Sequence, residues 1–452
     1  MKSERGNFGS KVGIVLATAG SAVGLGNVWR FPYMAGENGG AAFILIYIAC
    51  IFILGIPGML SEFIVGRHGQ ANAARSYDKL SGGRPWKFIG YLGILTSTII
   101  LGFYAVVAGW CLQYLFASIF GQLSGDVQYV KTYFQDFSCH PVYPVLWGVY
   151  FILVTQWVVM RGVRSGIERA SKFLMPILLI LLLVLVVASC MLPGAVDGIR
   201  FLLKPDFSKL SGGVMLEALG QAFFSLSLGT ACLCTYASYF TKDTNLLNSA
   251  GQIALLDTII AVLAGLMIFP AAASVGVSPD SGPSLIFITL PNVFQQAFAS
   301  VPVIGYVVSV MFYALLVFAA LTSTISMHEI GTVFFTEELH LPRRYSAWII
   351  TVVASVLCVF CSLSVGAYDN LKLMGKGLMD FCDMLTANFM LPLGGLLTCI
   401  FVGWYVPKQV VRDEFTNNGT LSSRFFGVYL FAVRFVCPVC IIIIFLHQLG
   451  VI

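Results

Sequence analysis

Charged residues are scarce in this chain. Asp, Glu, Lys and Arg make up 10% of the 452 residues, whereas hydrophobic residues make up 58%. An average soluble domain has about 25% charged residues, so a chain of this composition cannot cover itself with a water-soluble surface. We therefore expect an all-α polytopic membrane protein whose surroundings are the lipid bilayer.

Several functional motifs are also missing. The sequence contains no Walker A motif, no protein-kinase signature and no H-E-x-x-H zinc motif, so we expect no enzyme. Most of the twelve cysteines fall in apolar runs without metal-ligand spacing, which favours a packing role. The basic residues are scattered over separate loops, which argues against a nucleic-acid partner. Charged residues lead directly into the first span, so we expect no cleaved signal peptide.

Apolar runs of about 20 residues predict eleven membrane helices. If the N-terminus is cytoplasmic, 18 of the 26 Lys and Arg residues lie in cytoplasmic segments, six lie outside, and Arg30 and Arg434 lie within spans. This satisfies the positive-inside rule, so we predict a multi-pass protein of the plasma (inner) membrane with its N-terminus cytoplasmic and its C-terminus outside. The predicted spans are 12–35, 41–66, 88–121, 143–160, 173–193, 214–239, 248–276, 303–335, 346–364, 374–404 and 423–448.

Glycines interrupt the first span. Gly20, Gly24 and Gly26 lie within seven residues, which predicts a break in the helix. Glycines can also serve close helix packing, so this signal alone leaves both interpretations open. A second polar, Gly-containing stretch, 221–231, interrupts the sixth span about 204 residues later. Breaks at corresponding positions of two halves indicate a secondary transporter with inverted repeats and mark its substrate site.

Several carboxylates fall within predicted spans, among them Glu62 and Asp257. Glu62 would either be a neutral, hydrogen-bonded core group or hold the N–H groups of unwound backbone. Asp257 lies in an otherwise apolar stretch of the seventh span. An intramembrane carboxylate is costly unless it is paired, so both residues are candidates for function.

Five groups of residues form recognisable motifs. They are Gly20–Pro32 with Tyr33, Glu37-Asn38-Gly39-Gly40, Gln221–Gly229 with Tyr236-Ala237-Ser238-Tyr239, Leu321-Thr322-Ser323, and Asp380-x-x-Asp383. Together these motifs resemble the neurotransmitter:sodium symporter family, in its prokaryotic amino-acid transporter branch, and the resemblance runs in register from Arg5 to about the eleventh span. It implies the LeuT-like fold, in which two inverted five-helix repeats have helices 1 and 6 unwound at mid-membrane.

The resemblance also implies a domain organisation. A single transporter domain would cover residues 1–452, with repeat one at about 10–195, repeat two at about 213–405 and an extra helix at about 421–448. Many family members have twelve spans, so a chain with eleven is similar to a shorter branch.

The resemblance places an amino-acid site at the two breaks. Helix N-terminal N–H groups near Leu25 and Gly26, with the Tyr104 hydroxyl, would hold the substrate carboxylate. Carbonyl groups near Ala22, Phe224 and Ser225, with Ser227 nearby, would receive the ammonium group. The side-chain walls would be Ser21, Ile100, Phe224, Thr230, Ser323 and Met327.

Two sodium sites and two gates are implied in the same way. The first sodium site would use the Ala22 carbonyl, Asn27, Ser225 and Asp257, together with the substrate carboxylate. The second would use the carbonyls of Gly20, Val23 and Ala319 and the hydroxyls of Thr322 and Ser323. The gates would be Arg30 with Asp383 outside and Arg5 with Glu337 inside, although the family usually has Asp at the position of Glu337 and Trp at that of Phe8.

Two positions narrow the expected substrate and ions. Family members that carry monoamines have Asp at the position of Gly24, so glycine there implies a zwitterionic amino acid. Phe224, Ile100 and Met327 around the pocket imply that its side chain is apolar or aromatic. Chloride-dependent members have a neutral Asn at the position of Asp257, so we expect no chloride requirement. A bound cation favours the ionised form of a carboxyl group, which makes proton counter-transport a companion hypothesis.

The sequence thus predicts a sodium-coupled amino-acid importer. Two alternatives remain, a sodium-dependent amino-acid sensor and an ion channel lined by the same polar breaks.

Overall fold

The computed structural model describes residues 6–124, 126–276, 285–368, 370–448 and 450. These residues are almost entirely helical, as predicted. The strands among them are β1 (Lys372–Leu373) and β2 (Lys376–Gly377), which pair as a short antiparallel hairpin.

Nine helical segments in the described part of the chain are long and apolar enough to cross a bilayer. Several contain a π-helical turn that divides them into two labelled helices. The segments are Ala41–Gly69 (α3, Ala41–Cys50, and α4, Ile56–Gly69), Lys87–Ile119 (α6), Tyr143–Met160 (α8), Val163–Cys190 (α9, Arg169–Cys190), Leu246–Ser274 (α13), Pro302–Glu338 (α15), Arg343–Leu363 (α16), Leu378–Tyr405 (α17, Leu378–Leu385, and α18, Leu391–Ile400) and Phe426–Gln448 (α20, Phe426–Phe431, and α21, Cys437–Gln448).

The first predicted span is a broken helix. α1 (Lys11–Ala22) starts at Ser10, whose side chain accepts a hydrogen bond from the Gly13 N–H group. It ends at Val23, where the backbone becomes extended. The segment Gly26–Glu37, which contains a π-helical turn and α2 (Phe31–Glu37), continues at an angle of 55° to α1. The bent pair counts as a tenth candidate span.

The sixth predicted span is also interrupted. α11 (Gly212–Ser225) and α12 (Cys232–Ala237) are each too short to cross a bilayer, and Ser227, Gly229 and Ala231 between them have positive φ angles. The interruption explains why length and composition find nine or ten spans in the described residues. The total of eleven remains a prediction, as do the inverted repeats.

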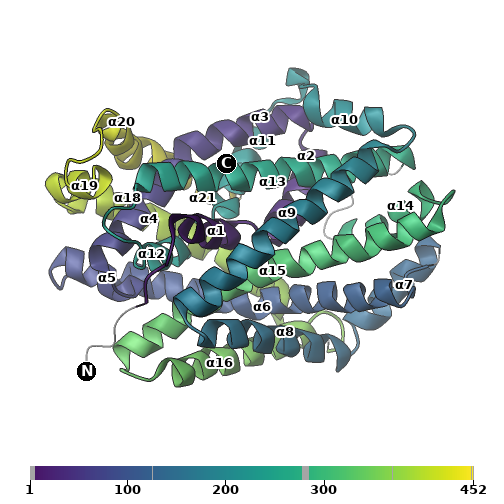
Figure 1. Cartoon of the computed structure of the whole chain (residues 1–452), viewed down its shortest axis with the longest axis horizontal. Coiled ribbons are helices and arrows are strands. Elements are labelled where there is room, and N and C mark those ends of the chain that lie inside the picture. Colours follow the sequence, from purple (N-terminus) through teal and green to yellow (C-terminus); the bar gives the residue numbers. More distant parts are fainter. Residues whose placement is uncertain (1–5, 125, 277–284, 369, 449, 451–452) are drawn as a thin grey trace.

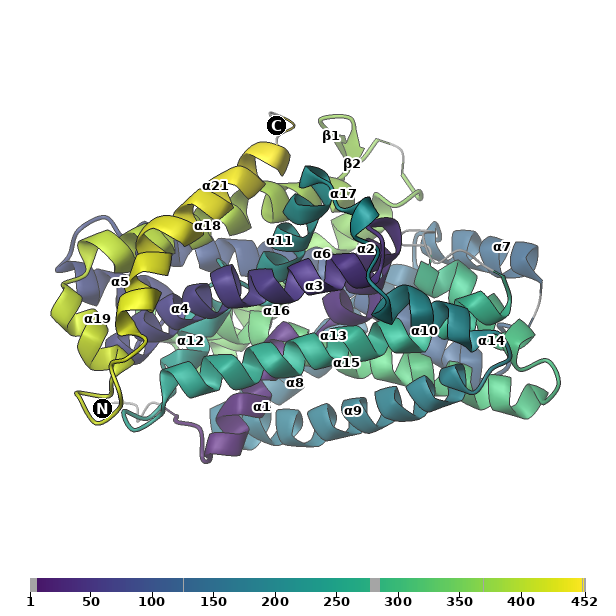
Figure 2. The same cartoon turned by 90° about the horizontal axis from the view of Figure 1, so that it is seen from above.

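The two longest helices form the centre of the molecule. α15 and α6 pack against each other, and α8 and α16 pack on both of them. α1 packs against α15, α13 and α9, whereas α11 packs against α3 and α12 against α4. Figures 1 and 2 show these helices running roughly along the long axis of the molecule. The shorter helices are α5 (Ala73–Ser81), α7 (Val127–Ser138), α10 (Ala195–Leu203), α14 (Leu290–Ala297) and α19 (Lys408–Phe415).

The short helices mark the two ends of the molecule. α5 and α19 lie at the end that carries the N-terminal segment, which we call the N-face, whereas α7, α10 and α14 lie at the opposite end (Figure 1). Helices α6, α9, α13 and α15 run between the N-face and this opposite end (Figure 1).

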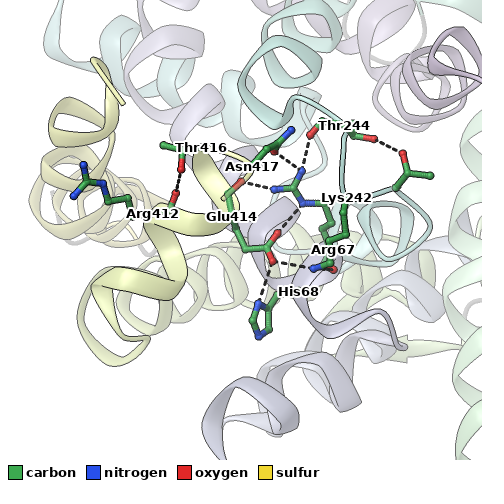
Figure 3. Close-up of polar contacts among 9 residues, drawn as sticks. Arg67, His68, Lys242, Thr244, Arg412, Glu414, Thr416 and Asn417 are labelled. Carbon is green, nitrogen blue, oxygen red and sulfur yellow. Dashed lines mark hydrogen bonds and ion pairs between the residues drawn. The ribbon is translucent and has the colours of Figure 1, made fainter. Parts of the chain in front are cut away.

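A buried arginine ties three connections together at the N-face (Figure 3). Arg67, at the end of α4, is 1% exposed, and its Nε atom donates to Glu414 Oε2 on α19 at 2.7 Å. Its Nη1 atom donates to the Thr244 carbonyl at 2.5 Å and to Asn417 Oδ1 at 2.9 Å, and Nη2 donates to the Glu414 carbonyl. Lys242 Nζ lies 3.0 Å from Glu414 Oε1. The cluster joins α4, the α12–α13 connection and α19.

The charges around Glu414 determine its protonation. Partial burial would raise the pKa of this carboxyl, but the hydrogen bond from His68 and the charges of Arg67 and Lys242 outweigh burial and lower the pKa to about 2. A carboxyl with a lowered folded-state pKa stabilises the fold above its ordinary pKa, and this contribution is lost as the pH falls towards the folded-state value.

We predict that Glu414→Gln lowers the free energy of unfolding at neutral pH by about 3 kcal/mol, because it leaves Arg67 buried without its charged partner. The melting temperature of the wild type should also fall as the pH drops from about 4.5 to about 2, the interval between the ordinary and folded-state pKa of Glu414. The Glu414→Gln variant should lack the part of this fall in melting temperature that is due to protonation of Glu414. Melting in detergent, followed by the intrinsic fluorescence of the seven tryptophans, measures both effects over the whole pH interval.

Lys242→Gln is the matched control, because the Lys242 side chain is 52% exposed. An exposed ion pair contributes about 0–1 kcal/mol, so this change should alter the melting temperature little. Equal effects of the two substitutions would contradict a specific role for the buried pair.

Candidate functional site

The first helix break lies close to Tyr104 on α6 and Ser323 on α15. The Leu25 N–H group, just after the end of α1, donates to the Tyr104 hydroxyl at 3.0 Å. A Cβ atom built on Gly24 would lie 2.4 Å from Ser323 Oγ and 3.0 Å from the Tyr104 hydroxyl oxygen. The first break therefore packs so closely against two polar side chains that any side chain at position 24 would require Ser323 to move.

Glu62 satisfies the second break. Its Oε1 atom accepts from the Gly229 N–H group at 2.7 Å, and Oε2 accepts from the Cys234 N–H group at 3.3 Å. Gly229 has φ +81°, a conformation that favours glycine. Of the two roles considered for Glu62, the structure shows the second, in which the carboxyl group holds unwound backbone. Span 2 and the broken span 6 are thereby joined.

Asp257 is the centre of a buried polar network beside the breaks. It is fully buried, and its Oδ1 atom accepts from Asn27 Nδ2 at 2.7 Å. Its Oδ2 atom accepts from the hydroxyls of Ser225 at 2.8 Å and Tyr47 at 3.1 Å. Asn27 Oδ1 in turn accepts from the Gly24 N–H group at 3.0 Å. No described Lys, Arg or His forms an ion pair with Asp257, so this carboxyl group sits among neutral donors.

A second group of oxygens lies where α1 meets α15. The Thr322 hydroxyl donates to the carbonyls of Ala319 at 2.9 Å and Val23 at 3.3 Å. Ser323 Oγ lies 3.5 Å from the Val23 carbonyl. Gly20 is buried one turn earlier on α1. Hydroxyl and carbonyl oxygens are the donors that a hard cation prefers. The described residues contain no cluster of three or more His, Cys, Asp or Glu side chains suited to a transition metal.

The predicted substrate walls come from four elements. Ser227 donates to the Ser21 carbonyl at 3.3 Å, and Thr230 donates to the Ser227 carbonyl at 2.7 Å, so these residues connect the two breaks. Phe224 lies against Gly26, with ring carbon Cε1 3.3 Å from a Cβ atom built there. Ile100 and Met327 are half-buried, and helical spacing places Ile100 one turn before Tyr104 and Met327 one turn after Ser323. Ala22 and Ser225 are buried at the ends of α1 and α11.

The outer-gate residues are not directly paired. Arg30 stacks on the Phe224 ring, with its guanidinium carbon 4.3 Å from the ring centroid. Asp383 and Glu217 attract Arg30 electrostatically, but Arg30 has no ion-pair partner among the described residues. The Phe224 ring thus contacts both Arg30 and the first break at Gly26.

At the N-face, Arg5 lies outside the described residues. Its predicted partner Glu337, near the end of α15, accepts from the backbone N–H group of Asn72 at 2.6 Å and from Asn72 Nδ2 at 3.1 Å. Phe8 is buried and packs edge-on against Tyr236 and Tyr239 of the broken span, with ring centroids 5.9 and 6.0 Å apart.

Two N-face contacts were missed by the sequence analysis. Arg343 forms a salt bridge with the buried Glu329 on α15, which also accepts from the Tyr239 hydroxyl at 2.7 Å. Glu168 accepts from the Gly9 N–H group at 2.6 Å and from Ser10 Oγ at 3.0 Å. Glu329 could have been found from the sequence, because it is a carboxylate in an apolar span. Glu168 lies in a charged loop, where sequence does not distinguish it from its neighbours.

The comparisons with known proteins agree with this architecture. The model of the Sodium:neurotransmitter symporter family matches residues 5–141 and 134–452. An uncharacterized sodium-dependent transporter of Bacillus subtilis, YhdH, is 39% identical over 98% of both chains, and one of Haemophilus influenzae is 36% identical over 99% of this chain and 98% of its own. The crystal structure of MhsT in complex with L-phenylalanine is 41% identical, with a TM-score of 0.89 over 98% of this chain and 100% of that one. The chain therefore belongs to the sodium:neurotransmitter symporter family and is a multi-pass membrane transporter with the LeuT fold.

Proposed function

We propose that this transporter is a sodium-coupled symporter that imports a zwitterionic amino acid with an apolar or aromatic side chain. The observation that carries the proposal is that the two helix breaks meet, Ser227 bonding to the Ser21 carbonyl, with Tyr104 at the first break and the buried Asp257 network beside it. Unwound helices near the membrane centre offer positive and negative dipole ends to the two charged groups of an amino acid. No enzymatic step is involved.

The substrate's carboxylate is held by the N–H groups of Leu25 and Gly26 and by the Tyr104 hydroxyl. Its ammonium group meets the carbonyls of Ala22, Phe224 and Ser225, near the Ser227 hydroxyl. Two findings support this arrangement: Leu25 and Tyr104 already face each other at 3.0 Å, and the similar MhsT was solved with L-phenylalanine. The side chain of the substrate lies among Ser21, Ile100, Phe224, Thr230, Ser323 and Met327.

Sodium fits the two oxygen groups. The first ion takes the Ala22 carbonyl, Asn27, Ser225 and Asp257, and a carboxylate without a basic partner favours binding of a cation there. The second ion takes the carbonyls of Gly20, Val23 and Ala319 with the hydroxyls of Thr322 and Ser323. The negative charge that Asp257 carries when sodium is bound makes chloride unnecessary, and its release of a proton as sodium binds would provide proton counter-transport.

Spans 1, 2, 6 and 7 rock against the other helices to give alternating access. The Glu62 bonds to Gly229 and Cys234 support joint motion of spans 2 and 6. The N-face is cytoplasmic, so that Arg5 and Glu337 form the inner gate, and Arg30 with Asp383 forms the outer gate. Eleven spans arranged as two inverted repeats, 10–195 and 213–405, with a further helix at 421–448, place the C-terminus outside.

Concentrative uptake tests the proposal against its two alternatives. Proteoliposomes with an inward sodium gradient should accumulate radiolabelled L-phenylalanine above the external concentration, and potassium should not replace sodium. An ion channel would dissipate gradients without accumulating the amino acid, and a sensor would bind it without uptake. Tight binding of a monoamine with no binding of amino acids would contradict the proposed substrate class.

We predict that Tyr104→Phe weakens amino-acid binding by about 10- to 100-fold, because one hydrogen bond to the charged carboxylate is lost. A scintillation-proximity assay with L-phenylalanine in saturating sodium measures the change. Tyr91→Phe is the control, since Tyr91 lies on the same helix but at its exposed N-face end. A Tyr104→Phe variant that binds as the wild type does would place the carboxylate elsewhere.

We predict that Thr322→Val combined with Ser323→Ala abolishes sodium-dependent uptake while the protein still folds and inserts. Both changes remove hydroxyls that face the Val23 carbonyl. Thr98→Val controls for the loss of an ordinary hydroxyl, because Thr98 bonds back to the Ile94 carbonyl of its own helix. Unchanged sodium affinity in the double variant would refute the second sodium site.

We predict that uptake by the wild type is unchanged when gluconate replaces chloride, because Asp257 supplies the negative charge. Asp257→Asn should lower uptake and make the remainder depend on chloride. Proteoliposome uptake in the two salts measures both results. A large loss of wild-type uptake in gluconate would overturn the prediction.

A further inference from the structure

Arg434 is an intramembrane charge that the proposed transport cycle does not use. It lies in a π-helical turn, Ala432–Val436, between α20 and α21 of the last membrane segment. Its neighbours Phe431 and Phe435 are 60% and 48% exposed, so this part of the segment faces the lipid. A charge at such a position is costly unless something compensates it.

The protein compensates only part of this charge. Arg434 Nε donates to the Gly403 carbonyl at 2.6 Å, and the Trp404 indole donates to the Arg434 carbonyl at 3.1 Å. The guanidinium carbon lies 5.5 Å from the centre of the Trp404 ring. Among the described residues, no carboxylate pairs with Arg434, and its two terminal nitrogens have no acceptor.

Two other arginines inside the protein, Arg67 and Arg343, each have a carboxylate partner. Arg67 has acceptors on all three nitrogens, among them the Glu414 carboxylate. Arg343 bonds Val159 and the Glu329 carboxylate in the same way. The half-buried Arg434 keeps two nitrogens available at the lipid-facing surface, and an arginine fork of this kind matches the geometry of two phosphate oxygens.

The depth of Arg434 suits a lipid headgroup. Gly403 and Trp404 directly precede Tyr405, the last residue of the segment Leu378–Tyr405. This segment ends at the N-face, just before α19. Figure 2 shows α18 and α21 side by side at the edge of the molecule. Trp404 is 57% exposed, and exposed tryptophans are enriched where the membrane interior meets the headgroups. Arg434 therefore lies near the boundary at which phospholipid phosphates are found.

We propose that Arg434 and Trp404 form a binding site for the phosphate of an anionic phospholipid. The terminal guanidinium nitrogens donate to the phosphate oxygens, the Gly403 carbonyl orients the guanidinium through Nε, and the acyl chains lie along Phe431 and Phe435. Inorganic phosphate offers the same oxygens, but the apolar and aromatic surroundings favour the phosphate of a lipid.

Native mass spectrometry of the full chain tests this site. Protein in detergent is titrated with phosphatidylglycerol, with phosphatidylcholine or with inorganic phosphate. We expect one phosphatidylglycerol to bind more tightly than the others and Arg434→Gln to weaken its binding about fivefold, the factor typical of one basic residue at a membrane surface. Arg412→Gln, which removes an exposed arginine of α19, should leave this binding unchanged.

Photo-cross-linking provides a second measurement that does not require a substituted protein to fold. A photoactivatable phosphatidylglycerol should label peptides from 401–406 and 431–438 of the wild type. Equal losses of binding in the Arg434 and Arg412 variants would indicate unspecific attraction and overturn the proposal. Equal binding of phosphatidylcholine, preferred binding of inorganic phosphate, or labelling confined to other segments would also overturn it.

Discussion

The constraint on which this structure depends is that a backbone polar group inside a membrane must have a partner. Two helices are broken in the middle of the molecule, and each break would be prohibitively costly in lipid. Glu62 accepts from two N–H groups of the second break, whereas the Tyr104 hydroxyl and the Asn27 side chain accept from Leu25 and Gly24 at the first. The side chains that make the breaks possible thus also bring three separate spans to the same place.

The features that follow from local chemistry could be predicted from the sequence. Low charge and apolar runs indicate a membrane protein of helices, and clustered glycines or hydroxyls indicate where helices break. Glu62 and Asp257 stood out because a carboxylate is rare in an apolar span. The family motifs then supplied the pairing of residues far apart in the chain, such as Tyr104 with Leu25 or Asp257 with Asn27, and the structure places these residues in contact.

What could not be predicted depends on contacts between distant segments. From the sequence, Arg67 is one of the basic residues expected in a cytoplasmic loop. In the structure it is buried against Glu414, which lies nearly 350 positions later in the chain. The family resemblance pairs Arg30 with Asp383, but it gives no sign that the Arg30 guanidinium stacks on the Phe224 ring, a contact between segments far apart in the chain. The number of spans is ambiguous because α11 and α12 are each too short to satisfy a criterion based on length.

The crowding at Gly24 limits how this transporter can change. Because Ser323 Oγ occupies the place of any Cβ atom at position 24, even alanine there requires Ser323 to move. A carboxylate at position 24, the feature that distinguishes monoamine carriers, would therefore require another Ser323 rotamer or a smaller residue at position 323. Positions 24 and 323 are thus coupled through space, and residue 323 belongs to the proposed second sodium site. A change of substrate class at position 24 would consequently also act on the proposed ion site.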